Sequence, residues 1–134
     1  MTTELEGPPD LLTVNYEIQR LQRYHDRLLI LETEDQEAIN AFLEGFLIHF
    51  RNLLDFLDSR GGDDDIKAID FVPDFKSTNS PEKYRERINK RLAHLSRSRA
   101  DHKKGWDVPT MLNEMRDSFD EFWQAAVTQV GEEE

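Results

Sequence analysis

The chain has 134 residues, of which 37% are hydrophobic and 34% are charged, so it is long enough for one domain with its own core. It contains no cysteine, which excludes a disulfide framework, a thiol nucleophile and a cysteine-based zinc site. Its net charge of −11, from 17 basic and 28 acidic residues, argues against general affinity for nucleic acid.

The first nine residues are polar and include Gly7-Pro8-Pro9, which predicts a loose tail. They lack the basic start and the apolar core of a signal peptide, and the chain has no apolar run of membrane-spanning length. We therefore expect a cytoplasmic protein that makes no membrane contact. The expected organisation is a flexible tail over 1–9, a single helical domain over 10–130 and an acidic tail over 131–134.

Two amphipathic helices are predicted in the first half of the chain. The first begins near Asp10, a suitable N-cap, and its apolar residues recur at alternating spacings of four and three. The second follows Thr33 and Gln36, which fit a capping box, and extends to about Ser59, just before two glycines. The two apolar stripes consist of Val14, Ile18, Leu21, His25 and Leu28, and of Ile39, Leu43, Phe46, Phe50, Leu53 and Leu57.

Residues 61–79 are irregular but rich in apolar side chains, so we expect a structured loop rather than a linker. Ser80-Pro81 is a strong helix start, and the third helix that follows has a narrow apolar stripe. Trp106 is expected to anchor the chain before a fourth helix, which begins near Pro109. Because no segment has the alternation of a strand, the predicted fold class is an all-α antiparallel four-helix bundle with one structured loop. The third and fourth stripes consist of Tyr84, Ile88, Leu92 and Leu95, and of Met111, Leu112, Met115, Phe119, Phe122, Ala126 and Val130.

The basic residues are concentrated in one part of the chain. Residues 76–104 contain ten Lys or Arg and three acidic residues, a net charge of +7, so the remainder of the chain carries −18. Such asymmetry is typical either of a solvated helix face or of a binding surface. It also allows complementary contacts between two copies of the chain, and we expect a homodimer.

One edge of the third helix combines groups that suit RNA chemistry. Arg87 and His94 are seven residues apart, which on a helix is about 10 Å along the axis and within roughly 20° in azimuth, and Arg91 lies between them. Guanidinium groups bind phosphate through parallel hydrogen bonds, and imidazole transfers protons near neutral pH. The alternative is an arginine-rich helix whose charges pair with acidic neighbours. The expected phosphate-binding residues are Lys90, Arg91, Arg97 and Arg99.

The spacing Arg87-x₆-His94, on a late helix of an all-helical chain, resembles the motif of the HEPN superfamily. Nuclease members of that family carry Arg-x₄₋₆-His and act on RNA at a dimer cleft without metal. The resemblance implies that His94 transfers the proton and that Arg87 stabilises the phosphate in a metal-independent endoribonuclease, in a toxin–antitoxin or phage-defence setting. HEPN motifs usually have a polar residue directly after the arginine, whereas this chain has Ile88.

A polar patch is predicted between the second and third helices, where His49 and Asn52 would meet Asn89 and His94. Such a patch is either a buried network that fixes the register of the helices or part of an active cleft. The histidines and acidic residues lack the helical spacings that put metal ligands on one face, so we expect no metal and no other cofactor.

The sequence leaves open whether the chain is an enzyme. The leading hypothesis is a HEPN-like protein that binds or cleaves RNA through the basic helix edge. The first alternative is a non-enzymatic module whose partner is another protein. The second alternative is a helical bundle that binds a small ligand, lined by Phe42, Phe46, Phe50, Phe56 and Trp123.

Overall fold

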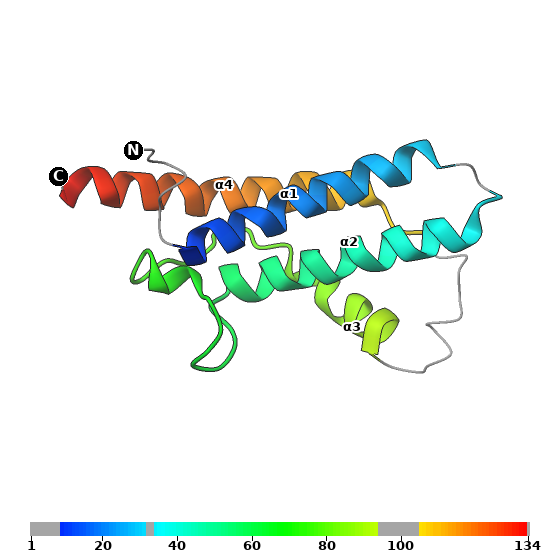
Figure 1. Ribbon diagram of the computed structural model, residues 1–134. Coiled ribbons are helices and arrows are strands. Elements are labelled where there is room, and N and C mark those ends of the chain that lie inside the picture. The colour runs from blue at the N-terminus through cyan, green and yellow to red at the C-terminus, as the bar shows by residue number, and fades with distance from the viewer. Residues whose placement is uncertain (1–8, 32–33, 94–104, 134) are drawn as a thin grey trace. The chain divides into compact units, whose positions relative to one another are not determined.

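The computed structural model describes residues 9–31, 34–93 and 105–133. These residues form α1 (Pro9–Ile30), α2 (Gln36–Leu57), the 3-10 helices η2 (Ala68–Asp70) and η3 (Glu82–Tyr84), α3 (Arg85–Ala93) and α4 (Val108–Glu133) (Figure 1). The predicted all-α class, with four α-helices and one structured loop, is confirmed. Within these ranges, no helix combines the length and the apolar character needed to cross a membrane.

The chain divides into two compact units, Met1–Leu53 and Leu54–Glu134, and the boundary falls inside α2. The first unit contains α1 and most of α2. The second unit contains the last turn of α2, the loop with η2 and η3, and helices α3 and α4. The expectation of a single helical domain over 10–130 stays a prediction.

In the first unit, α1 and α2 form an antiparallel pair (Figure 1). Tyr24 contacts Phe42, with ring centroids 5.8 Å apart, and Glu17 hydrogen-bonds to His49. The earlier residue of α1 therefore contacts the later residue of α2, and the later residue of α1 contacts the earlier residue of α2. This is the order of contacts in an antiparallel pair. This arrangement follows from the short connection between two helices with apolar stripes.

Aspartate side chains cap the starts of α2 and α4. Oδ1 of Asp35 accepts a hydrogen bond from the N–H of Ala38 at 3.3 Å, and Oδ1 of Asp107 accepts one from the N–H of Thr110 at 3.2 Å. Each carboxylate satisfies an N–H group that has no partner within its helix. Thr33, the cap predicted for α2, lies outside the residues that the structure describes.

The end of α2 comes slightly earlier than the sequence predicts. Ser59 has a positive φ of 53°, and the N–H groups of Ser59 and Arg60 bond to the carbonyls of Phe56 and Asp55. These two bonds form a Schellman motif, which satisfies carbonyl groups at a helix end. The helix therefore stops at Leu57, because the left-handed residue is the serine and not one of the two glycines that follow it.

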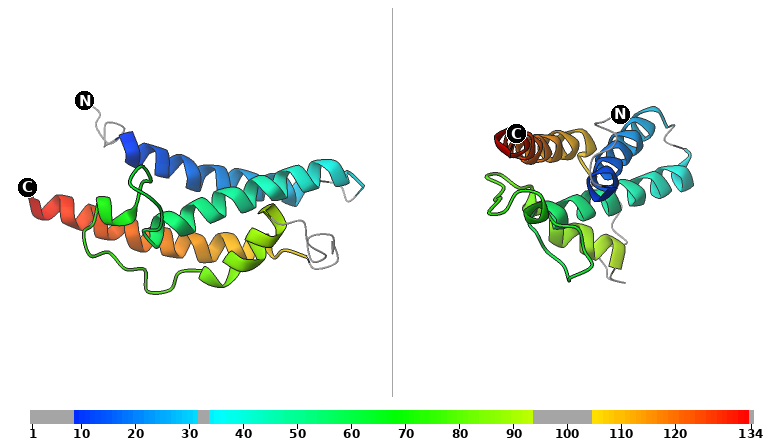
Figure 2. Two further views of the ribbon diagram at one scale, coloured as in Figure 1. Left: turned by 90° about the horizontal axis from the view of Figure 1, so that it is seen from below. Right: turned by 60° about the vertical axis from the view of Figure 1, so that its left-hand side comes forward.

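In the second unit, the chain between η2 and α3 runs antiparallel to α4 (Figure 2). Hydrogen bonds connect the two segments, and their partners appear in reverse order along the chain. They join Gln129 to the carbonyl of Phe71, Glu121 to the N–H of Thr78, Ser118 to the carbonyl of Asn79, and Glu114 to the hydroxyl of Tyr84.

Phe122 lies at the centre of an aromatic cluster in the second unit and is fully buried. Its ring centroid lies 4.9 Å from that of Phe56 and 5.5 Å from that of Phe75, both in edge-on geometry. Phe71 and Phe119 complete the cluster. Edge-to-face contacts between buried rings add to the free energy of burial. Residues 61–79 are therefore a structured loop that is fixed through Phe71 and Phe75.

Candidate functional site

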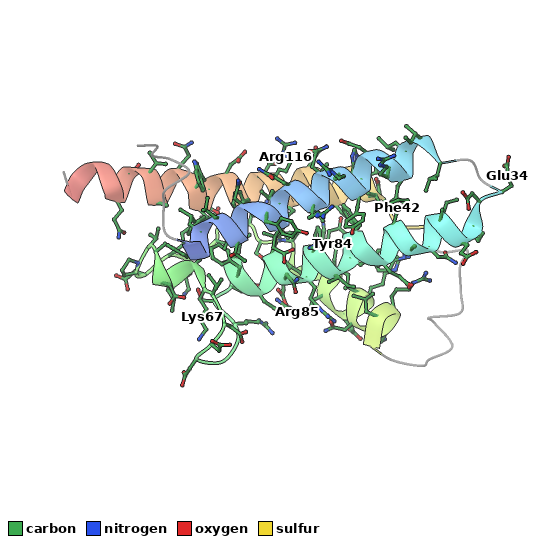
Figure 3. All side chains as sticks on the ribbon, in the orientation of Figure 1. Glu34, Phe42, Lys67, Tyr84, Arg85 and Arg116 are labelled. Atoms are coloured by element: carbon green, nitrogen blue, oxygen red, sulfur yellow. The ribbon has the colours of Figure 1, made fainter. Side chains whose placement is uncertain are left out.

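Helix α3, which carries the predicted basic edge, is fixed through the turn that precedes it. The sequence predicts a helix start at Ser80-Pro81, but η3 comes first and the α-helix begins at Arg85 (Figure 3). The hydroxyl of Tyr84 donates to Oε1 of Glu114 on α4 at 2.6 Å. Ile88 is fully buried, so one side of α3 lies in the protein interior.

The basic side chains of α3 differ in their exposure. Lys90 is exposed and its Nζ lies 3.2 Å from Glu86, one turn away on the same helix. Arg87 and Arg91 are half-buried. A surface ion pair such as that of Lys90 contributes little to stability, so phosphate can compete for the same ammonium group. The described part of the predicted edge therefore consists of three cations on one nine-residue helix.

Arg87 joins α3 to the start of α4. Its guanidinium carbon lies 3.8 Å from the centroid of the Trp106 ring, and its Nη2 donates to the carbonyl oxygen of Gly105 at 3.0 Å. A guanidinium is attracted to the negative face of an indole at this distance. Trp106 directly precedes Asp107, the cap of α4. Trp106 therefore anchors the chain before the last helix, as expected from the sequence.

This contact holds together the two ends of the most basic part of the sequence. From Arg87 to Lys104 the chain has seven basic residues and one acidic residue, a net charge of +6. Arg87 opens this stretch, and Gly105, which follows it, accepts the hydrogen bond. Three predicted site residues of the stretch, His94, Arg97 and Arg99, lie outside the residues that the structure describes.

His49 and Asn52 share one partner, Glu17 of α1. Nδ1 of His49 hydrogen-bonds to Oε2 of that carboxylate, and Nδ2 of Asn52 donates to Oε1 at 3.1 Å. The imidazole also stacks on Tyr24, with ring centroids 5.4 Å apart. These contacts join α2 to α1 within the first unit. The sequence analysis instead predicts that both residues contact the third helix. Asn89, the other described member of the predicted patch, is half-buried on α3 in the second unit.

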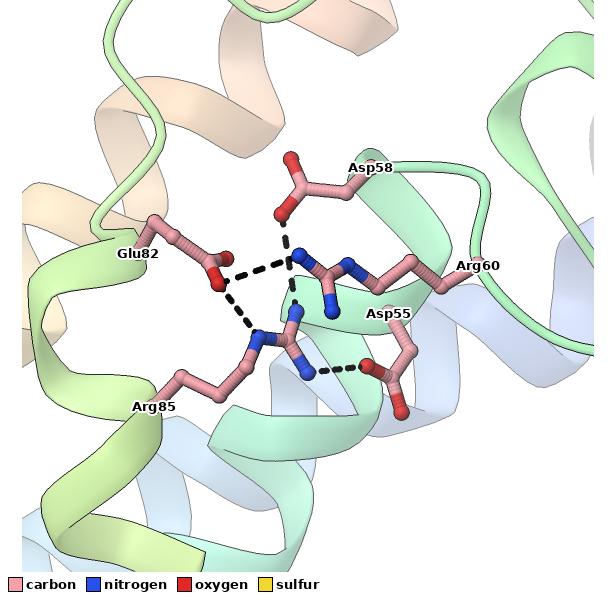
Figure 4. Close-up of polar contacts among 5 residues, drawn as sticks. All are labelled: Asp55, Asp58, Arg60, Glu82 and Arg85. Carbon is pink, nitrogen blue, oxygen red and sulfur yellow. Dashed lines mark hydrogen bonds and ion pairs between the residues drawn. The ribbon is translucent and has the colours of Figure 1, made fainter.

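Arg85 forms an ion-pair network that the sequence analysis does not identify (Figure 4). Only 14% of its side chain is exposed. It donates from Nη1 to Asp55 and from Nε to Glu82, each at 2.5 Å, and its Nη2 lies 3.5 Å from Asp58. Arg60 adds a longer contact to Glu82 at 3.4 Å. This arginine is therefore neutralised by three carboxylates and does not belong to the basic edge.

The network shifts the pKa values of its members in opposite directions. Burial raises the pKa of Asp58, and a hydrogen bond with Glu82 raises it further. Burial also acts to raise the pKa of Glu82, but hydrogen bonds with Arg85 and Asp58 outweigh it, and the net pKa is lowered. Burial acts to lower the pKa of Arg85, and the bonds to Glu82 and Asp55 reverse this, so its pKa is raised. Among the described residues, no group of three or more His, Cys, Asp or Glu could hold a metal ion.

The aromatic residues considered for a ligand cavity are divided between the two units. Phe42, Phe46 and Phe50 belong to the first unit, and Phe56 and Trp123 belong to the second. Phe46 and Phe50 are fully buried and contact each other, with ring centroids 6.0 Å apart. Contacts of this kind are typical of an aromatic core. They give the small-ligand hypothesis no specific support.

Comparisons with protein-family models, with curated proteins and with solved structures found no match to this chain. The similarity to HEPN nucleases depends on the Arg87-x₆-His94 motif and stays a prediction.

Proposed function

We propose that this chain binds RNA through the basic edge of α3 and the basic residues that follow it, and that it cleaves RNA there as a HEPN-like nuclease. In this proposal Arg91, Lys90, Arg97 and Arg99 bind phosphate, Arg87 stabilises the reacting phosphate and His94 transfers the proton.

The observation that carries the proposal is the contact between Arg87 and Trp106. It fixes Arg87 against Trp106 and Gly105, on the same nine-residue helix as Lys90 and Arg91, so the three cations of α3 lie close enough together to contact one stretch of phosphate backbone. Neutralising several phosphates releases their counterions, which is the main source of affinity for nucleic acid.

The net charge of −11 does not oppose this proposal at short range. At physiological ionic strength, exposed charges interact over about 8 Å. A local group of cations therefore interacts more strongly with a bound phosphate than the distant acidic residues do. Three carboxylates of the second unit, those of Asp55, Asp58 and Glu82, share the cations Arg85 and Arg60, so their cluster keeps a net charge of only −1. Local charge therefore determines whether phosphate is attracted to α3.

A binding measurement with matched variants tests the proposal. The probe is a short fluorescent 2′-O-methyl oligouridylate, which has no 2′-hydroxyl to attack the phosphate, at about 50 mM salt, where phosphate contacts are strong. Replacing Lys90 and Arg91 with alanine removes two cations, so we expect affinity to fall about tenfold or more. Arg23→Ala removes an exposed cation of α1 and is expected to bind as the wild type does.

Two results would contradict this function. Equal affinity of the wild type and the double variant would place the binding elsewhere on the chain. The absence of binding at low salt would leave the protein-interaction module as the better hypothesis.

We also propose that the chain forms a homodimer. The segments with charges of +7 and −18 can complement each other between two copies. Helix α4 adds an apolar pair one turn apart, Trp123 and Val127, which are 36% and 52% exposed. Sedimentation at low and at high salt tests this proposal, and a monomer under both conditions would contradict it.

A toxin–antitoxin or phage-defence role in the cytoplasm belongs to the same proposal, because both settings involve cleavage of cellular RNA. Expression of the chain in a bacterial host is then expected to slow growth, and His94→Ala to relieve that effect. Equal growth inhibition by both proteins would contradict a role of His94 in toxicity.

A further inference from the structure

We infer that Trp106 stacks on an unpaired base, so that the ligand of the α3 site is single-stranded RNA and not duplex RNA. The inference rests on the proposed RNA-binding function and adds the class of RNA and the residue that selects it.

One contact orders the indole ring of Trp106, and one hydrogen bond orders its backbone. Its ring lies against the guanidinium of Arg87, and the carbonyl of Trp106 accepts a hydrogen bond from the N–H of Val108 at 2.9 Å. The neighbouring residues Gly105 and Asp107 are exposed, and Trp106 itself is half-buried, so part of its side chain is accessible to solvent. A ring that is already ordered loses little conformational entropy when a ligand stacks on it.

Trp106 is also the one aromatic residue in this basic part of the sequence. Between Tyr84 and Phe119 the chain contains no other Phe, Tyr or Trp. Proteins that bind single strands combine cations that follow the backbone with aromatic side chains on which bases stack. In duplex RNA the bases are already stacked on each other, and a protein contacts mainly phosphates and 2′-hydroxyl groups. The combination of Trp106 with Arg87, Lys90 and Arg91 therefore fits an unpaired strand.

A purely structural role for Trp106 makes a different prediction. If the indole served only to hold Arg87, the bases of the ligand would not affect binding, and a strand without bases would bind as well as RNA. If the indole stacks on a base, affinity depends on the presence of bases at constant phosphate charge. The two roles are therefore separated by changing the ligand while the protein stays the same.

The experiment uses the full chain with Trp123→Phe, so that tryptophan emission comes from Trp106 alone. The ligands are a 2′-O-methyl oligouridylate, an abasic strand of equal length and a duplex of equal length. We expect the oligouridylate to quench the emission and to bind about tenfold more tightly than the abasic strand or the duplex. Equal affinity for the oligouridylate and the abasic strand, without quenching, would overturn the inference.

Variants of Trp106 supply the matched controls. Trp106→Ala is expected to lose about tenfold more affinity for the oligouridylate than for the abasic strand, which senses only the positioning of the cations, while Trp106→Phe keeps most of the base preference. An equal loss for both strands would mean that the ring only positions the cations, and would overturn the inference. A different result would contradict the proposed function itself, namely that the wild type binds neither strand at low salt.

Discussion

Arg85 and Asp55 lie 2.5 Å apart, between Nη1 and Oδ1, and this ion pair joins the first residue of α3 to the last turns of α2. The same guanidinium also contacts Asp58 and Glu82. Most of the Arg85 side chain is buried, whereas its partners are 22% to 42% exposed. The pair is therefore the centre of a network that connects two segments distant in the sequence, residues 55–60 and 82–85.

Replacing Arg85 with alanine is expected to lower the free energy of unfolding by about 2–3 kcal/mol, because it leaves partly buried carboxylates without their cation. Urea unfolding measures the loss. The matched control is Arg60→Ala, which removes a cation that is 56% exposed and has one contact at 3.4 Å, with an expected loss below about 1 kcal/mol. Similar losses in the two variants would show that the network is not centred on Arg85.

Tyr84 is expected to make the second unit less stable at alkaline pH. Burial, together with the hydrogen bond to Glu114, raises the pKa of Tyr84 from 10.0 to about 12. The folded protein therefore holds this proton more tightly than the unfolded chain does. The resulting stability is fully present below pH 10 and is lost as the pH rises from 10 to about 12.

Tyr84→Phe removes this titration while it keeps the ring. The free energy of unfolding of the variant should therefore fall less than that of the wild type between pH 10 and about 12. Urea unfolding across this range compares the two proteins. Parallel curves would mean that the bond between Tyr84 and Glu114 contributes nothing to the pH dependence.

Gly45 permits a close approach of α1 and α2 in the first unit. A Cβ atom at this position would lie 2.9 Å from Cζ of Tyr24, whose ring is held by contacts with Phe42 and His49. Alanine favours a helix over glycine by about 1 kcal/mol, but overpacking a constrained ring costs about 1–3 kcal/mol. Gly45→Ala is therefore expected to destabilise the wild type by about 1 kcal/mol and to stabilise a Tyr24→Ala variant. The same sign in both backgrounds would contradict the close contact.

The core of the fold was predictable because its apolar residues recur with helical period. Phe46, Phe50, Met111, Met115 and Phe122 all lie on predicted stripes, and all are fully buried. The helix ends were less predictable, because they depend on local backbone geometry. Nothing in the sequence marks Ser59, with its positive φ, as the residue that ends α2 in preference to the glycines after it.

The site was predictable only in part, because the sequence shows how many charged residues it contains but not which of them form ion pairs. Arg85 is one of ten cations between residues 76 and 104, and its partners Asp55 and Asp58 precede it by many residues. Likewise, the spacing of His49 and Asn52 along α2 says nothing of Glu17, which approaches only when α1 pairs with α2. For Trp106 the sequence does give an indication of a role at the site, because this large apolar residue lies next to a basic stretch and directly before a helix cap.

If the chain cleaves RNA at the proposed site, His94→Ala should reduce the rate about 10²–10⁴-fold, the usual contribution of a general acid or base. Cleavage is expected to continue in chelator and to leave a 2′,3′-cyclic phosphate, because the attacking hydroxyl belongs to the RNA. His102→Ala, which removes another histidine of the same stretch, is the matched control. Unchanged cleavage by His94→Ala would assign the activity to another site or to a contaminant.

The salt dependence of RNA affinity is the sharpest test of an RNA site on α3, because it counts the phosphate contacts made by the basic edge. For single strands, the logarithm of the binding constant falls with the logarithm of salt concentration by about 0.7 per phosphate contact. We expect a slope of about −2 to −4 for the wild type, and a slope shallower by about 1.4 when Lys90 and Arg91 are both alanine. Arg23→Ala should keep the wild-type slope. A slope that is near zero, or identical in the wild type and the double variant, would contradict the assignment of the RNA site to α3.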